Sequence, residues 1–157
     1  SDTIVKKIYI LSNKADTLPL INKCYGEQKQ IGLLPVNQST ITYTWNPITH
    51  LSSSSAPNPL CNTNNNIQYK LLVSNGICTD TLYQNIRVNN LKIDAGLDTM
   101  YCLEPILLTA NYDSRINSVF WFSNNTFEDT LGANSSLSVS STGVFYVRGF
   151  FNGCEIY

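Results

Sequence analysis

Charged residues are scarce in this chain of 157 residues, where they make up 13% of the sequence and leave a formal net charge of −1. This balance lacks the basic patch that binding to nucleic acid or to an anionic membrane surface requires. No apolar run approaches the length of a membrane span, and residues 1–7 have the pattern of a folded strand rather than of a signal peptide. We therefore expect a protein that neither binds nucleic acid nor spans a membrane.

Residue types that carry catalysis or bind metals are also few. His50 is the only histidine, it lies in a segment rich in Pro and Ser, and no nucleophile elbow accompanies it. The chain has no Cys-x-x-Cys pair and no Gly-rich phosphate loop. The glutamates fall near expected turns and strand ends, where nothing pairs them as glycosidase carboxylates: Glu27, Glu104, Glu128 and Glu155. The sequence thus predicts a protein without enzymatic activity and without a cofactor.

What the chain does contain is a repeat built around two tryptophans. Residues 40–45 (TITYTW) and 117–123 (NSVFWFS) alternate at period two around Trp45 and Trp121, which is typical of a half-buried strand. Cysteines flank both segments, Cys24 and Cys78 the first, Cys102 and Cys154 the second. The leading cysteines lie 78 residues apart, and both the tryptophans and the trailing cysteines lie 76 apart. Spacing this regular indicates an internal repeat.

The pattern within each repeat predicts an all-β fold. No window shows helical periodicity of useful length, and turn signals such as Asn75-Gly76 separate short alternating segments, as in β-sandwiches. Residues 67–74 and 145–149 take equivalent registers after the tryptophan strands. The expected core side chains are Tyr43, Trp45, Tyr69, Trp121 and Phe145.

Three segments follow from the repeat. Residues 1–10 (SDTIVKKIYI) match residues 79–88 (TDTLYQNIRV) at an offset of 78, so they read as the closing strand of a preceding module. Residues 11–90 form a complete sandwich module, and residues 91–157 form a second one that lacks most of its last strand. We expect the second module to be completed either by residues outside this chain or by an edge strand from another chain.

Several strings in the chain resemble a known family. CYGEQKQIGL, YTWNPITHLSSSSAPNP, IQYKLLVSNGICTDTLYQNIRV and DAGLDTMYC are similar to the tandem Ig-like and PKD-like repeats of large secreted and cell-surface proteins of Bacteroidota. The resemblance covers most of the chain, although the second module has Leu103-Glu104 in place of the glycine and has no Trp-x-Pro. It implies a disulfide-stapled spacer or adhesive module at the outer-membrane exterior, exported by type IX secretion and associated with gliding or adhesion. Its implied partners are neighbouring repeats, surface polysaccharide or another surface protein.

The five cysteines suit an oxidising compartment outside the cytoplasm. Pairing equivalent positions joins Cys24 to Cys78 and Cys102 to Cys154, with loops whose closure contributes about 4 kcal/mol each. Cys61 is left over in this scheme, either as a buried small hydrophobe or as an alternative partner of Cys24 or Cys78.

Strand parity predicts a contact surface on the second module. If Trp121 points inward, then Phe120 and Phe122 point outward, and the same parity places Tyr146 and Phe150 beside them. The alternatives are a parity that slips by one residue or a loop that covers the patch.

Two further features concern modification and metal binding. Five of the seven aspartates begin an Asp-Thr-apolar triplet, which is similar to the O-glycosylation acceptor pattern of Bacteroidota and marks Thr3, Thr17, Thr81, Thr99 and Thr130; a repeated structural role is the alternative. Asp94 and Asp98 flank a glycine and form a weak candidate calcium site, for which a turn capped by aspartate is the more usual explanation.

Overall fold

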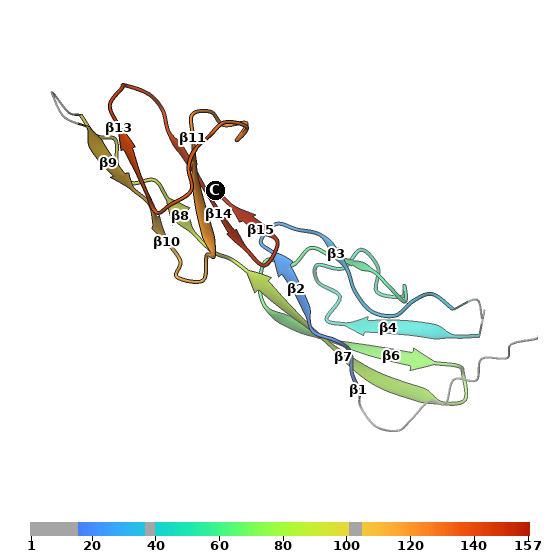
Figure 1. Ribbon diagram of the computed structural model, residues 1–157. Coiled ribbons are helices and arrows are strands. Elements are labelled where there is room, and N and C mark those ends of the chain that lie inside the picture. The colour runs from blue at the N-terminus through green and yellow to red at the C-terminus, as the bar shows by residue number, and fades with distance from the viewer. Residues whose placement is uncertain (1–15, 37–39, 101–104) are drawn as a thin grey trace, which may run out of the picture. The chain divides into compact units, whose positions relative to one another are not determined.

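The computed structural model describes residues 16–36, 40–100 and 105–157, and all of its regular elements in these ranges are β-strands (Figure 1). The chain divides into two compact units, one ending at Val88 and the other running from Asn89 to Tyr157. The expected closing strand at residues 1–10 lies outside the described residues. The prediction of an all-β fold is confirmed.

The main sheet of the first unit is built on a long hairpin. Strands β6 (Ile67–Ser74) and β7 (Thr79–Asn89) pair antiparallel, and the turn between them depends on Asn75, whose Oδ1 accepts from the N–H groups of Ile77 and Cys78. On the other side of β6 lies β4 (Thr42–Asn46), and β7 also pairs with β1 (Asp16–Thr17) and β2 (Ile21–Cys24). The β1 pairing is parallel, with Asp16 opposite Leu82.

A smaller layer covers this sheet and completes a sandwich. It consists of β3 (Lys29–Gln30), β5 (Leu60–Cys61) and the loops around them. The core between the layers joins both sides and contains Ile31, Trp45, Cys61, Tyr69, Leu71, Val73 and Ile86. Burial alternates along β6, as the period-two pattern predicts, because successive strand side chains point to opposite faces. Each large side chain buried in this way contributes roughly 1.5–3 kcal/mol.

The second unit repeats the plan in smaller form. Its main sheet has the order β12 (Thr130–Gly132), β11 (Ser118–Phe122), β14 (Tyr146–Phe151) and β15 (Cys154–Ile156). The remaining strands form two antiparallel pairs, β9 (Ile106–Thr109) with β13 (Ser136–Val139), and β8 (Ile93–Asp94) with β10 (Asn111–Tyr112).

The two indoles occupy equivalent places in their units. Trp45 Nε1 donates to the Ala56 carbonyl at 2.8 Å, and Trp121 Nε1 donates to the Asn134 carbonyl at 3.1 Å. Both side chains are fully buried, as is Tyr69, while Tyr43 and Phe145 are half-buried. Each unit therefore has its own core around its own tryptophan, in agreement with the repeat.

The expected Cys24–Cys78 bridge is wrong. Cys78 is a free, exposed thiol, Cys61 is a free, buried one, and Cys24 is disulfide-bonded. Cys24 lies near the start of β6, because Gly26 donates to Asn64 Oδ1, whereas Cys78 follows the far end of β6. The eight residues of β6 separate the two ends by roughly 26 Å, and a disulfide requires Cα atoms within about 7 Å.

The structure also bears on the predictions made for the other cysteines. Cys154 is disulfide-bonded as well. Because Cys61 and Cys78 are free thiols, a bridge between Cys102 and Cys154 would leave no cysteine of the five to pair with the bonded Cys24, so the expected Cys102–Cys154 bridge is also wrong. Cys61 bonds neither Cys24 nor Cys78 and packs in the core as a small hydrophobe, with its Sγ 3.6 Å from the Tyr69 hydroxyl.

Candidate contact surface

The outward side of β11 and β14 carries a group of aromatic side chains around one arginine. Phe120 lies opposite Arg148, Phe122 opposite Tyr146, and Ser118 opposite Phe150. Because Trp121 and Val147 face the core, these residues share the opposite face. We call Phe120, Phe122, Tyr146, Arg148 and Phe150 the aromatic face.

The exposed position expected for Phe122 is wrong. Phe122 is buried, because the loop after β11 folds back and places the Phe127 ring against it, with the ring centroids 5.2 Å apart in a T-shaped contact. The backbone of Phe127 adopts a left-handed conformation, with φ of 58°, to bring the ring there. The alternative of a covering loop is therefore correct for this residue, while Phe120, Tyr146 and Phe150 stay half-exposed.

Arg148 lies at the centre of the aromatic face. Its guanidinium carbon is 4.0 Å from the Phe127 ring centroid, close enough for a cation–π interaction, and Nη1 is 3.3 Å from Glu155 Oε2. The side chain is only 19% exposed, and its Nε is buried without a hydrogen-bond partner among the described residues. A guanidinium stacked on an aromatic ring is suited to carboxylate or hydroxyl groups of a ligand that reach its exposed part.

The sequence alone could have predicted that Arg148 belongs to the aromatic face, although the prediction from strand parity named only aromatic residues. Arg148 stands two residues from both Tyr146 and Phe150, so the same parity places it on their face. Phe127 and Tyr157, whose rings lie 5.9 Å apart, had no such signal, because their places depend on a loop and on the end of β15.

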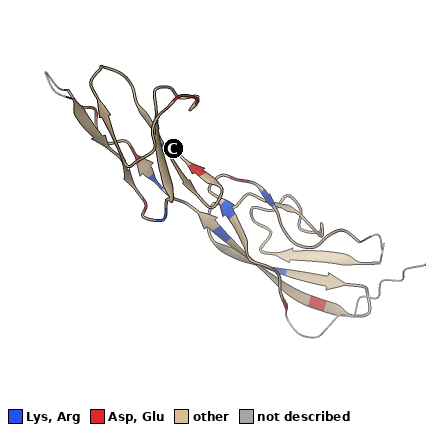
Figure 2. Cartoon of the chain, in the orientation of Figure 1, with Lys and Arg blue, Asp and Glu red and all other residues tan. Residues whose placement is uncertain are grey.

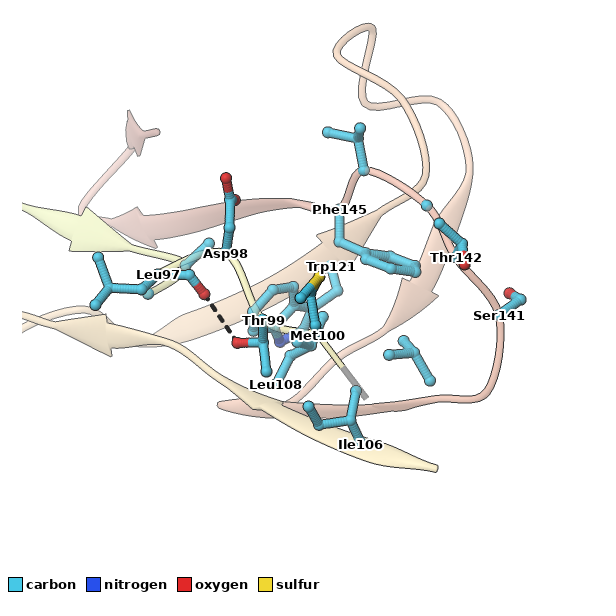
Figure 3. Close-up of a pocket in the computed structure, with 15 residues that line it drawn as sticks. Leu97, Asp98, Thr99, Met100, Ile106, Leu108, Trp121, Ser141, Thr142 and Phe145 are labelled. Carbon is cyan, nitrogen blue, oxygen red and sulfur yellow. Dashed lines mark hydrogen bonds between the residues drawn. The ribbon is translucent and has the colours of Figure 1, made fainter. Parts of the chain in front are cut away.

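A pocket of about 560 Å³ opens elsewhere on the second unit. Its wall includes Trp121 and Phe145 from the main-sheet side, Ile106 and Leu108 from β9, and the segment 95–100 (Figure 3). The side chains of Leu97 and Met100 are 94% and 99% exposed at its rim. The lining also contains polar side chains, among them Asp98, Thr99, Ser141 and Thr142.

The described residues contain no cluster of side chains suited to hold a metal ion. No group of three or more His, Cys, Asp or Glu side chains comes together there, and acidic and basic residues are thinly scattered (Figure 2). Asp94 Oδ1 accepts from the Gly96 N–H, which is the turn cap given above as the alternative to calcium. The described residues also include no helix suited to cross a membrane.

Buried polar groups serve the fold. Lys23 Nζ donates to the carbonyls of Thr63 and Cys24, and burial lowers its pKa. The Tyr69 hydroxyl donates to the Thr49 carbonyl, and burial, with the Cys61 contact, raises the pKa of Tyr69.

The threonines of the Asp-Thr-apolar triplets differ in accessibility. Thr17, Thr99 and Thr130 are exposed, Thr81 is half-buried within β7, and Thr3 lies outside the described residues. Asp80 Oδ1 accepts from the Thr81 N–H, so one triplet has a structural role. Modification of these threonines stays a prediction.

No family model and no curated protein matches the chain. Among solved structures it is similar to the four N-terminal Ig domains of Dscam1 isoform 6.9, with 15% identity, a TM-score of 0.38 and coverage of 92% of this chain and 42% of that one. It is also similar to Sidekick-1 immunoglobulin domains 1–4, with 14% identity, a TM-score of 0.35 and coverage of 87% and 42%. The chain thus spans about two fifths of the length of these four-domain structures. With likeness at this level, the assignment of two tandem β-sandwiches rests on the strand pairing and the cores described above.

Proposed function

We propose that the chain is a non-enzymatic repeat module of a secreted or cell-surface protein, which acts as a spacer and makes contacts through the aromatic face. The observation that carries the proposal is this face itself. Half-exposed rings surround an arginine whose side chain is 19% exposed. Aromatic and arginine side chains are the residues that contribute most at protein contacts.

The spacer role rests on the tandem arrangement. Two units, each with its own buried indole, repeat along the chain, and a repeat of this kind extends reach without needing chemistry. The disulfide-bonded state of Cys24 and Cys154 suits an extracellular location. The resemblance to Bacteroidota repeats adds the finer proposal of an outer-membrane exterior location, type IX export and a role in gliding or surface attachment.

The ligand that the aromatic face fits is a surface polysaccharide or another surface protein. Rings stack on the apolar faces of sugars, and a guanidinium donates to hydroxyl or carboxylate oxygens. The Phe120 and Phe150 rings lie 5.7 Å apart in a T-shaped contact on this face, so both take part in any contact made there.

Substituting these two rings tests the contact role. In the Phe120→Ser/Phe150→Ser variant we expect attachment of chain-coated beads to the surface of the producing cells to fall severalfold, with the far-ultraviolet circular dichroism spectrum unchanged. Tyr25→Ser, which removes an exposed ring from the first unit, is the matched control and should bind as the unmodified chain does. If the unmodified chain, the double variant and the control variant attach equally well, the aromatic face does not make the contact.

A second candidate is a carbohydrate-binding accessory module of a secreted hydrolase. The observation that favours it is Tyr157, which is 79% exposed and lies near Arg148, with 6.0 Å from the guanidinium carbon to the ring centroid. A glycan array separates the two candidates. Binding to one polysaccharide class, lost in Tyr157→Ala, supports the accessory module, whereas cell attachment without glycan binding supports the protein contact.

Glycosylation of the Asp-Thr-apolar triplets belongs to the same proposal. Mass spectrometry of the protein purified from its own cells should find a glycan on Thr17, Thr99 and Thr130, whose hydroxyls are exposed. Peptides without added mass at all three threonines would contradict it.

A further inference from the structure

The second unit carries most of the negative charge of the chain. Among its described residues six are acidic and three are basic, whereas the described part of the first unit has three acidic residues and four basic ones. The acidic residues of the second unit are Asp94, Asp98, Asp113, Glu128, Asp129 and Glu155. Charge of one sign concentrated in one unit favours a partner of the opposite sign.

Glu155 places one of these carboxylates on the aromatic face itself. It lies opposite Phe150 in the pairing of β14 with β15. Directly paired residues of neighbouring strands point to the same side of a sheet, so the Glu155 side chain shares the face of Phe150 and Phe120. The aromatic face is therefore bordered by a carboxylate on the side of β15.

Two more carboxylates border the aromatic face through the loop after β11. Glu128 follows Phe127, whose ring packs on Phe122, and Asp129 immediately precedes β12, which pairs with Phe122. Both acidic residues are exposed. Figure 2 shows acidic residues on this loop and on β15. Since β12 and β15 lie on opposite sides of β11 and β14, carboxylates border the aromatic face on both sides.

The arginine of the aromatic face does not offset these carboxylates toward a ligand. The guanidinium carbon of Arg148 lies 4.0 Å from the ring centroid of Phe127 and 6.0 Å from that of Phe150, and its Nη1 pairs with Glu155. The Arg148 side chain is 19% exposed, against 52% for Glu155. The aromatic face therefore presents more negative than positive charge to a ligand.

Aromatic rings and carboxylates together bind cations. A Lys or Arg side chain of a partner gains a cation–π contact with a ring and a charge-assisted hydrogen bond with a carboxylate. An acidic ligand instead meets like charges at Glu155, Glu128 and Asp129.

We propose that the partner bound by the aromatic face is a basic protein segment, whose Lys and Arg side chains contact Phe120 and Phe150 and pair with the bordering carboxylates. The proposal rests on the contact role proposed above for the aromatic face, and of the two ligands named there it selects a surface protein rather than a polysaccharide.

Fluorescence anisotropy of the whole chain with two labelled peptides tests the proposal. One probe alternates Lys and Tyr residues, and the other, of the same length, alternates Glu and Tyr residues. We expect the basic peptide to bind and the acidic one not to bind. The affinity for the basic peptide should fall as salt is added, because the contact is electrostatic.

Reversing the charge of the loop should reverse the preference between the peptides. In Glu128→Lys/Asp129→Lys we expect about tenfold weaker binding of the basic peptide and new binding of the acidic one, because the border beside β12 becomes basic. Both residues are exposed, so the substitutions leave the free chain folded. Phe120→Ser/Phe150→Ser should weaken binding of the basic peptide severalfold, because the cation–π contacts are lost.

Asp98→Lys/Asp113→Lys is the matched control. It changes the charge of the second unit by the same amount but away from the aromatic face, because Asp98 lines the pocket and Asp113 follows β10. At physiological salt, where exposed charges are screened within about 8 Å, it should bind the basic peptide as the unmodified chain does. Equal affinity for both peptides, or an equal loss in the control and the loop variant, would overturn the proposal.

The cell attachment assay separates this proposal from the contact role on which it rests. The basic peptide should inhibit attachment of chain-coated beads. If Phe120→Ser/Phe150→Ser loses attachment while neither peptide binds the unmodified chain, the contact role stands and the basic partner is wrong. Inhibition by soluble polygalacturonate instead of the basic peptide would likewise identify the partner as a polysaccharide and overturn the proposal.

Discussion

Gly32 shows how closely the first core is packed at the scale of single residues. Its φ of 90° lies in the left-handed region, and a Cβ added there would collide with the Pro57 carbonyl and would lie 2.7 Å from the Trp45 ring. Its N–H donates to Gln84 Oε1 at 3.4 Å, so its backbone is also held against β7. A glycine is required at this position for both conformation and space.

Gly32→Ala should destabilise the chain by about 2–4 kcal/mol, of which roughly 1 kcal/mol is left-handed strain and the rest is overpacking against Trp45. Gly76→Ala is the control, because Gly76 has a similar φ of 87° but open space around it. Urea unfolding followed by tryptophan fluorescence measures both. Equal losses of stability in the two variants would show that the contact with Trp45 does not matter.

The structure predicts an unusually low pKa for the Asp113 carboxyl group. Hydrogen bonds from the Arg115 side chain and backbone lower the pKa of Asp113 to about 2. Since the folded pKa is below the unfolded one, the interaction is fully present above the ordinary carboxyl pKa near 4 and is lost as the pH falls toward 2. Titration by NMR should give this low value, and Arg115→Gln should raise it; an unchanged pKa in the variant would contradict the assigned cause.

At the scale of elements, the loop after β11 decides how much of the aromatic face is exposed. Phe127 covers Phe122, touches the Tyr146 ring at 6.2 Å between centroids, and lies under the Arg148 guanidinium. The loop is held by Asn124, whose Oδ1 accepts from the Thr126 hydroxyl at 2.9 Å. The loop and the sheet face thus form one packed layer.

Phe127→Ala should cost about 1–3 kcal/mol and uncover Phe122, because the ring contacts are lost while the backbone stays left-handed. Phe127→Gly loses the same ring but tolerates φ of 58°, so it should be more stable than the alanine variant by roughly 1 kcal/mol. Urea unfolding and binding of a hydrophobic dye measure the two effects. An alanine variant as stable as the unmodified chain would show that the loop does not cover the sheet.

Strands with a strong period-two pattern were predictable as elements. β4, β6, β11 and β14 lie where alternation around Trp45, Tyr69, Trp121 and Val147 indicated, because alternation needs only the local pleat. The two-residue strands β3 and β5 contain too little pattern to be found this way, and their pairing depends on the long loop between them.

At the scale of the whole molecule, the disulfide state tests the corrected cysteine assignment. A reductant should lower the free energy of unfolding by about 2–4 kcal/mol. Cys24→Ser should show the same loss without reductant, because Cys24 is disulfide-bonded, whereas Cys78→Ser should keep the stability and the sensitivity to reductant of the unmodified chain. Thermal unfolding with and without reductant measures this, and a Cys78→Ser variant that resembles Cys24→Ser would restore the rejected bridge.

The sequence by itself determined the all-β class, the repeat and the inward direction of both tryptophans, because alternation and spacing are properties of short stretches. Only the tertiary structure decided which cysteines are free and which phenylalanine is covered. Cys24 and Cys78 flank the same repeat in the sequence, yet they lie at opposite ends of β6. Phe122 has outward parity, yet Phe127 buries it. Both outcomes depend on distances set by strand direction and by a folded loop, which a linear pattern does not contain.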